Sequence, residues 1–389
     1  MAEAFIVEAV RTAGGRRGGR LAGWHPADMA GEVLNAVVDR TGIDPAAIED
    51  VIMGCVSQGG EQGFQVGRGA VLASKLPQSV PAVSIDRQCG SSQQAIQFAA
   101  QAVMSGTQDV VIASGVESMT RVPMGSTGML FAQAGLGKSK SPRQEERFPD
   151  IQFSQFMGAE MIAKKYGFSR EELDAYSARS HRRAAEATER GDFKAEIVGL
   201  EVETPDGTLC HDRDEGIRYD ATPESIGAVK LLQEGGVISA ANASQICDGA
   251  SAVLVVSERA LKEHGLTPLA RVHNLTVTGG DPVIMLEEPL FATSKALKRA
   301  GLSIDDIDLY EVNEAFAPVP LAWLEHTGGD PAKLNVNGGA IALGHPLGAS
   351  GTKLMATLVH ALHKRGGRYG LQTMCEGGGL ANVTIVERL

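Results

Sequence analysis

The sequence has few of the features that mark a secreted, metal-binding or membrane-spanning protein. It contains 5 cysteines in 389 residues, and they are scattered without a C-x-x-C pair. An odd number of dispersed cysteines argues against a disulfide framework, and the ligand spacing of a zinc site is missing. No apolar run approaches the roughly 18 residues of a membrane span, so we expect neither a bound metal nor a membrane segment.

The chain also lacks a positive charge balance and a recognisable leader. Its formal net charge is −11, which argues against nucleic acid as a partner. The opening MAEAFIVEAV has no basic segment ahead of its short apolar run, so no secretory leader is expected. Together with the expected free thiols, this favours a cytoplasmic location.

Glycine is what the chain has in excess, with 47 residues against an average usage of about 7%. The densest stretch, NVNGGAIALGHPLGASG over 335–351, places His345 directly before a proline. Proline biases the preceding residue towards an extended backbone, and glycine lets the backbone approach a ligand closely. This setting makes His345 a candidate acid–base group. The alternative is an ordinary hydrogen-bonded histidine.

Strand-like and helix-like segments alternate at both ends of the chain, which is long enough for two or more packed units. The first part predicts a helix over 91–104 and strands over 51–56, 83–86 and 110–114. The last third predicts helices over 315–326 and 350–364 and strands over 308–312, 334–336, 370–374 and 381–386. The shared order of strand, glycine-bearing turn, helix and strand indicates a duplicated unit and a largely parallel sheet.

The region between these parts reads differently, and we expect an insertion over 119–245. It opens with a glycine-, serine- and proline-rich stretch over 122–149, and helices are predicted over 154–166 and 170–190. The second helix carries a basic group of four residues: Arg179, His181, Arg182 and Arg183. Such a group is either a solvated helix face or a contact for phosphates.

Two cysteines lie on turns that suit a reactive thiol. Cys89, in DRQCGSS, sits between a strand and a helix, and a helix N-terminus lowers a thiol pKa. Cys375, in MCEGGG, precedes glycine amides that could form an oxyanion hole. The alternative for each is a small buried apolar residue. Cys55, Cys210 and Cys247 lack such settings and are expected to be structural.

Asn313 lies at the end of a predicted strand, where parallel sheets place ligands. Its amide could orient a water molecule or an imidazole ring. The alternative is an N-cap for the helix that follows, because asparagine is among the preferred capping residues.

In combination these motifs resemble one family. The blocks CGS at Cys89, NEAF from Asn313, GHP around His345 and CEGGG from Cys375 look like the four signature blocks of thiolases, in the same order. The stretch AANAS ending at Ser244, followed by DGA, resembles the coenzyme A loop of that family. The resemblance covers essentially the whole chain.

The resemblance implies the thiolase fold. This is an α/β fold with two similar βαβ-rich halves in a layered α-β-α-β-α arrangement and an inserted loop domain. The N-terminal half would comprise 1–118 and 246–268, and the C-terminal half 269–389. The loop domain, 119–245, would bind coenzyme A (CoA) and make oligomer contacts.

The activity implied by the resemblance is that of an acyl-CoA C-acyltransferase. It would cleave 3-ketoacyl-CoA with CoA, or run the reverse Claisen condensation, through an S-acyl-cysteine intermediate. Cys89 would carry the acyl group, His345 would activate it, and Cys375 would shuttle the proton. Asn313 would hold a water for one oxyanion hole, and the N–H groups of Gly377 and Cys89 would form the other.

The resemblance also implies the ligands and the assembly. CoA and acyl-CoA are the substrates, no cofactor is bound permanently, and a homodimer or homotetramer is expected. Arg218 and Arg183 would contact the adenine–phosphate end of CoA. The remaining expected contacts with pantetheine and acyl groups are Ser244, Met157, Leu232, Met285, Ala315 and Phe316.

Departures from the family pattern bear on the substrate. Leu232 stands where short-chain biosynthetic members have phenylalanine, Phe156 stands where they have histidine, and Met285 is followed by LEEP. These changes favour a degradative enzyme of broad chain length over an acetoacetyl-CoA (biosynthetic) thiolase.

Three further alternatives remain at this stage. A ketosynthase-type condensing enzyme would need a second basic residue where Cys375 stands. A non-catalytic acyl-CoA binding or scaffolding protein would have lost the cysteines or His345, which this chain retains. A papain-like hydrolase would not need two glycine-flanked cysteines.

Overall fold

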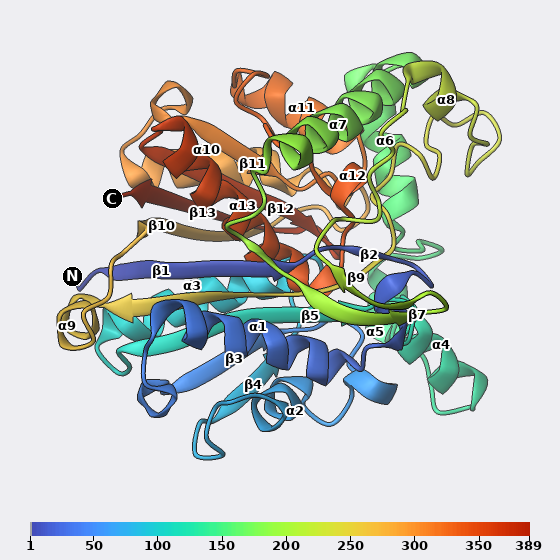
Figure 1. Ribbon diagram of the computed structural model, residues 1–389. Helices are drawn as coiled ribbons and strands as arrows, with labels where there is room; N and C mark the ends of the chain where they lie inside the picture. The colour runs from blue at the N-terminus through green and yellow to red at the C-terminus, as the bar shows by residue number, and fades with distance from the viewer. Residues whose placement is uncertain (1) are drawn as a thin grey trace.

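The two halves of the chain share one sheet, whose strands follow the order β11-β12-β13-β10-β1-β9-β5-β3-β4 (Figure 1). The computed structural model describes residues 2–389, so residue 1, the first of the expected N-terminal half, lies outside the described residues. The N-terminal strands are β1 (Ala4–Thr12), β2 (Gly15–Arg16), β3 (Asp50–Gly54), β4 (Ala82–Ile85), β5 (Val110–Ser118) and β9 (Cys247–Ser257). The C-terminal strands are β10 (Ala270–Gly279), β11 (Leu309–Val312), β12 (Tyr369–Glu376) and β13 (Leu380–Arg388).

The same strand order occurs in both halves. From the centre of the sheet outwards, the order is β1-β9-β5-β3 in the N-terminal half and β10-β13-β12-β11 in the C-terminal half. The outermost strand of the N-terminal half, β4, has as its counterpart only an isolated parallel bridge between Tyr310 and Leu334. The two first strands meet antiparallel, with Phe5 opposite Arg271 and Ile6 opposite Ala270. The sheet thus supports a duplicated unit.

The expectation of a largely parallel sheet was wrong. Parallel pairing is confined mainly to β3 with β4 and β5, and to β11 with β12. The last strand of each half runs antiparallel to both of its neighbours. Strand β9 lies between β1 and β5, and β13 lies between β10 and β12.

Helices form the layers around the sheet. On the N-terminal side lie α1 (Pro26–Thr41), α2 (Val66–Ala73), α3 (Ser91–Ser105) and α9 (Glu258–Glu263). On the C-terminal side lie α10 (Glu288–Ala300), α11 (Pro318–Thr327), α12 (Ala340–Leu343) and α13 (Ser350–Arg365). Figure 1 shows α1 and α2 on the outer side of one half and α10 and α11 on the outer side of the other. None of the helices in the described residues is both long and apolar enough to cross a membrane.

The central layer consists of α3 and α13, which pack against each other between the two halves. Apolar residues of both helices share one buried cluster with strands of both halves, including Ile96, Val359, Val253 and Val386. The two helices touch closely: a Cβ added to Gly351 would lie 1.9 Å from the backbone nitrogen of Gln93. This contact brings the N-terminal ends of α3 and α13 together.

The inserted region carries most of the remaining elements. Its helices are α4 (Ser126–Gln133), α5 (Pro142–Arg147), α6 (Gln155–Tyr166), α7 (Arg170–Arg190) and α8 (Pro223–Gly227). Its strands are β6 (Ile197–Val198), β7 (Leu200–Thr204) and β8 (Gly207–His211). The predicted helix over 170–190 is confirmed, and it begins with a capping box at Ser169 and ends at Gly191 in the left-handed conformation. The stretch over 122–149 contains α4 and α5, which its composition did not indicate.

One predicted helix starts later than expected. Residues 315–326 were expected to be helical, but α11 begins at Pro318, which occupies its first turn as proline often does. Ala315 and Phe316 instead pair with the coenzyme A-like loop, because Ser244 N donates to the Ala315 carbonyl and Ala243 bridges to Phe316.

Candidate active site

The turn that carries His345 is built on a glycine that no other residue could replace easily. Gly344 has a φ of +80°, and a Cβ there would lie 2.5 Å from the Cys247 sulfur. The N–H of His345 donates to the Gln245 carbonyl at 3.0 Å. His345 itself is only 3% exposed. The conformation of this turn therefore places the His345 ring in the protein interior.

Hydrogen bonds define the protonation state of the His345 ring. Its Nδ1 lies 2.5 Å from Ser350 Oγ, and that hydroxyl donates its own proton to the Pro346 carbonyl. Ser350 can therefore only accept, so Nδ1 carries the hydrogen and Nε2 has the free lone pair. Asn313 Nδ2 donates to Nε2 at 3.3 Å. Burial, with a smaller effect of the Lys353 ammonium, lowers the His345 pKa to about 3, which keeps the ring neutral.

Cys89 lies on the turn before α3, after Gln88 with a φ of +49° and before the N-cap residue Gly90. Its side chain packs with Leu347, two residues beyond His345, and with Met374, the neighbour of Cys375. The expectation of a lowered thiol pKa was wrong. Burial, reinforced by Glu376, raises the Cys89 pKa to about 12, because desolvation of the thiolate outweighs the helix terminus.

Cys375 lies at the end of β12, beside glycines whose backbones are left-handed at Gly378 and Gly379. It is 1% exposed, and burial followed by the nearby Cys89 raises its pKa well above the ordinary thiol value. Gly377 faces the residue before Cys89, since its added Cβ would lie 2.8 Å from Gln88 Oε1. The two thiols, the histidine turn and the glycine amides thus meet between the halves.

This arrangement suits covalent acyl transfer with a general base. Both thiols are protonated at rest, so a nucleophilic thiolate forms only when a base removes the proton. The unprotonated Nε2 of His345 is the neutral base in this buried space. Amides of the glycine turn after Cys375 are the donors available to a developing oxyanion. Among the described residues, no cluster of His, Cys, Asp or Glu could hold a metal, and all five cysteines are free.

Glu376 is a buried acid that the sequence did not draw attention to. Both of its carboxyl oxygens lack a hydrogen-bond partner, and its side chain packs against Gly90 and Asn382. Burial raises its pKa to about 8, although Arg87 opposes this. At neutral pH it is therefore mostly an uncharged acid beside the turn that carries Cys89.

Replacing Glu376 with glutamine should stabilise the protein increasingly as pH rises. Because the Glu376 pKa is raised from 4.5 to about 8 on folding, its protonated form stabilises the folded protein below pH 4.5. This stabilisation is lost progressively as pH rises from 4.5 to about 8. The gain of Glu376→Gln should therefore grow between these limits, by at most about 1.4 kcal/mol per pH unit. Melting temperatures at pH 5, 6.5 and 8 measure it, with exposed Glu263→Gln as control. A difference that does not change with pH would contradict the buried neutral acid.

Most of the expected CoA contacts lie around the coenzyme A-like loop and α6. Ser244, Ala315 and Phe316 are adjacent through the pairing described above, and Phe156 of α6 meets the Phe316 ring edge-on at 5.4 Å between centroids. The next residue, Met157, is half exposed. Gly158 packs on the Ile284 carbonyl, next to buried Met285. Leu232 is half exposed in the loop after α8.

The two arginines proposed for the nucleotide end occupy different settings. Arg218 is exposed, and its backbone N–H donates to His181 Nδ1. The Arg183 guanidinium instead donates to the carbonyls of Leu334, Asn335 and Pro331. Arg183 thus holds the chain ahead of the His345 turn, and its contact with the phosphates of CoA stays a prediction.

Several residues that shape the site were not identified from the sequence. Ser350 fixes the His345 tautomer, and a hydroxyl at the start of the following helix was the only local signal for it. Gln245 joins the coenzyme A-like loop to two other segments through its amide, which donates to the carbonyls of Gly216 and Ile341. Such long-range contacts have no sequence signature.

Comparison with known proteins gives a consistent result. The family model for the N-terminal domain of thiolases matches residues 4–259, and that for the C-terminal domain matches 266–388. The chain is 52% identical to the steroid 3-ketoacyl-CoA thiolase FadA6 of Mycobacterium tuberculosis, covering 100% of this chain and 95% of the relative. It is 43% identical to a 3-ketoacyl-CoA thiolase of Aeromonas salmonicida, with both chains covered fully at 100%. Human mitochondrial 3-ketoacyl-CoA thiolase in complex with CoA superposes with a TM-score of 0.89 at 37% identity, covering 100% of this chain and 98% of the other.

Proposed function

The chain belongs to the thiolase family, and on that premise we propose that it cleaves 3-ketoacyl-CoA with CoA in the degradative direction. The observation that carries the proposal is the meeting of Cys89, Cys375 and His345 between the halves, at the facing ends of α3 and α13. The names of the relatives support the same reaction. CoA and acyl-CoA act as substrates.

The reaction proceeds in two covalent steps. His345 Nε2 takes the Cys89 proton, and the thiolate attacks the 3-keto carbon. The bond between the α- and β-carbons breaks, and Cys375 gives its proton to the α-carbon of the departing acetyl-CoA. A CoA thiol then loses its proton to Cys375 and attacks the acyl-Cys89 thioester, which releases an acyl-CoA shortened by two carbons. The protonated His345 returns its proton to the departing Cys89 thiolate, so both cysteines and the histidine are restored. The thioester oxyanion of the departing acetyl-CoA is held by the protonated His345 with a water on Asn313, and the oxyanion of the tetrahedral adduct on Cys89 is held by the N–H groups of Cys89 and Gly377.

The apolar surface near the site suits an acyl group that is long or bulky. An exposed apolar surface lies on the loop domain beside Phe316, formed by Phe153, Phe156, Met157 and Met161. Apolar contact area of this kind stabilises a larger acyl group by about 25 cal/mol per Å² buried. Similarity to a relative named for steroid substrates supports a ring-bearing acyl group within this range.

A CoA-dependent cleavage assay tests the proposed function. Acetoacetyl-CoA, 3-ketooctanoyl-CoA, 3-ketopalmitoyl-CoA and a 3-ketoacyl-CoA with a steroid ring system serve as substrates. We expect kcat/KM for at least one of the larger substrates to exceed that for acetoacetyl-CoA by about tenfold or more, as one or two buried methylenes provide. A preference for acetoacetyl-CoA would favour the biosynthetic alternative, and no cleavage of any substrate would favour a non-catalytic acyl-CoA binding protein.

The nucleotide end of CoA is proposed to lie at Arg218. The arginine is exposed and belongs to the segment that the Gln245 amide ties to the Ser244 loop through Gly216. A single local arginine reconciles a polyanionic ligand with a protein of net charge −11. The protein is also proposed to work in the cytoplasm, where its five free cysteines stay reduced.

We expect the protein to form a homodimer through the edge strand β4. One side of β4 pairs with β3, while its other side has no partner in the described residues. Beside it, Phe64 is fully exposed with a φ of +45°, and Val83 and Leu72 are exposed as well. An unpaired edge with apolar neighbours is a template for a second copy.

The dimer can be tested by charging this surface. Phe64→Asp combined with Val83→Lys should convert a dimer into a monomer, because the introduced carboxylate and ammonium would lose their solvation at the interface. Size-exclusion chromatography with light scattering measures the mass. Leu389→Ser, which removes an exposed apolar side chain at the other end of the molecule, should leave the mass unchanged. A dimer that survives the double substitution would place the interface elsewhere.

A further inference from the structure

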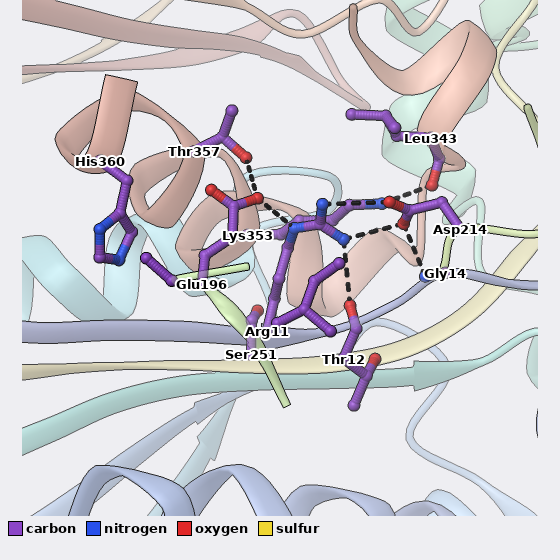
Figure 2. Close-up of polar contacts among 12 residues, drawn as sticks. Arg11, Thr12, Gly14, Glu196, Asp214, Ser251, Leu343, Lys353, Thr357 and His360 are labelled. Carbon is purple, nitrogen blue, oxygen red and sulfur yellow. Dashed lines mark hydrogen bonds and ion pairs between the residues drawn. The ribbon is translucent and has the colours of Figure 1, made fainter. Parts of the chain in front are cut away.

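A second polar cluster lies entirely inside the protein, next to the histidine turn (Figure 2). Arg11 of β1 binds Glu196 through Nε at 2.6 Å and Asp214 through its two terminal nitrogens at 2.8 and 3.1 Å. Lys353 of α13 lies in the same cluster. All four charged side chains are at most 4% exposed. The cluster joins the N-terminal half, the loop domain and the C-terminal half.

Lys353 makes the contacts that link this cluster to catalysis. Its ammonium donates to the carbonyl of Leu343 at 2.5 Å and to the carbonyl of Gly344 at 3.1 Å. These carbonyls belong to the two residues directly before His345. Figure 2 shows the lysine side chain running past Arg11 and Asp214 towards Leu343.

The position of Lys353 is electrostatically unfavourable for a positively charged side chain. It lies in the first turn of α13, where the helix dipole disfavours a cation, and burial lowers its pKa. Cys247 and the buried carboxylates of Asp214 and Glu196 act in the opposite direction, whereas Arg11, the second basic group, adds to the lowering. The cluster thus brings two basic and two acidic side chains together, so the buried ammonium has opposite charges near it.

The peptide unit before His345 is therefore fixed from both sides. This peptide unit consists of the Gly344 carbonyl and the His345 N–H. The Lys353 ammonium donates to the Gly344 carbonyl, and the His345 N–H donates to the Gln245 carbonyl. A planar peptide held at both polar groups leaves little freedom to rotate. The Cα of His345, and with it the direction of Nε2, is set by these two contacts.

We propose that Lys353 is the positioning residue of His345, and that the buried Arg11–Glu196–Asp214 cluster supplies the charge that keeps its ammonium in place. The proposal rests on the proposed function, since it assigns His345 as the base. It separates two tasks: Ser350 fixes the tautomer of the ring, and Lys353 fixes the turn that carries it. Lys353 does not touch the reacting atoms.

The test compares Lys353→Met, Lys353→Gln and Lys353→Arg with the parent protein. Each is assayed well below its own melting temperature, so that lost stability does not enter the rate. We expect Lys353→Met to lower kcat by about 100-fold, as a displacement of about 1 Å of a catalytic group does, with the Kd for CoA within about twofold of the parent. Lys353→Gln, which keeps an amide donor, should lose less and serves if the methionine variant does not fold.

Lys353→Arg should recover most of the rate, because a guanidinium can donate to both carbonyls. A small internal cavity lined by Asn313, Gly344 and Lys353 provides space for the larger group. The control is Thr357→Val, one turn further along α13, which removes the hydrogen bond from Thr357 to Glu196 without touching the turn. It should lower the melting temperature and leave kcat within about twofold, as expected for one lost buried hydrogen bond.

A second readout separates this proposal from the proposed function. Alkylation of Cys89 by iodoacetamide reports removal of the thiol proton without any acyl substrate, and it should slow in Lys353→Met and Lys353→Gln but not in Thr357→Val. Folded methionine or glutamine variants that keep the parental kcat and alkylation rate would overturn the positioning role. An inactive parent whose Cys89 alkylation still depends on Lys353 would count against the proposed function alone.

Discussion

Cys89→Ser abolishes acyl transfer, with kcat for 3-ketoacyl-CoA cleavage lowered by about 10⁴-fold or more. A serine hydroxyl is a far weaker acid than a thiol, and the neutral His345 cannot generate the alkoxide in a site that raises even the Cys89 pKa to about 12. The thioester intermediate would also be replaced by an ester, which is a poorer acyl donor to CoA. Steady-state release of acetyl-CoA measures the loss.

Two other cysteines provide controls for this substitution. Cys210 is exposed in β8, and Cys55 is buried after β3, where its backbone lies against Gly348. Cys210→Ser should leave kcat unchanged, and Cys55→Ser should affect stability rather than rate. If Cys89→Ser retained kcat within tenfold of the parent, the nucleophile would be another residue.

Cys375→Ser separates the two half-reactions. The variant should still accept an acyl group on Cys89 from a simple acyl-CoA, because Cys89 and His345 provide the attack and CoA can leave as a thiolate without a proton from Cys375. It should fail in the steps that move a proton at the α-carbon or the CoA thiol, so overall cleavage should fall by about 10²–10⁴-fold. Burial beside Cys89 keeps the Cys375 thiol protonated, ready to donate, whereas a serine hydroxyl is too weak an acid for this role.

The measurement combines steady-state cleavage with the stoichiometry of acyl-enzyme. In Cys375→Ser we expect about one acyl group per chain to accumulate, while turnover is nearly lost. A variant that neither accumulates acyl-enzyme nor turns over would show that Cys375 is needed for acylation itself. Normal turnover would remove Cys375 from the mechanism.

Local signals predicted the parts of the fold that depend on neighbours in the chain. Helix α7 follows from a capping serine, its glutamate three residues later and a terminal glycine, all within one segment. The glycine–histidine–proline turn was likewise recognisable, since Gly344 needs its positive φ whatever surrounds it. The repeated order of strand, turn, helix and strand along the chain could be inferred because each half carries its own turn and helix signals.

Features that depend on distant residues could not be read from the sequence. The antiparallel joining of β1 and β10, which makes one sheet of two halves, has no local pattern. The sign of the Cys89 pKa shift was missed because burial by Leu347 and Met374, more than 250 residues away in the chain, outweighs the nearby helix terminus. Lys353 reads as an ordinary helix residue until Asp214 and Leu343 are placed beside it.

The central claim is that Cys89 carries the acyl group. The most direct test is to mix the unaltered protein with acetoacetyl-CoA or a longer 3-ketoacyl-CoA in the absence of free CoA, quench with acid, digest, and weigh the peptides. We predict a mass increase of one acyl group on the peptide that contains Cys89, removed again when CoA is added before the quench. An acyl group found on another residue, or no adduct with any substrate, would contradict the account.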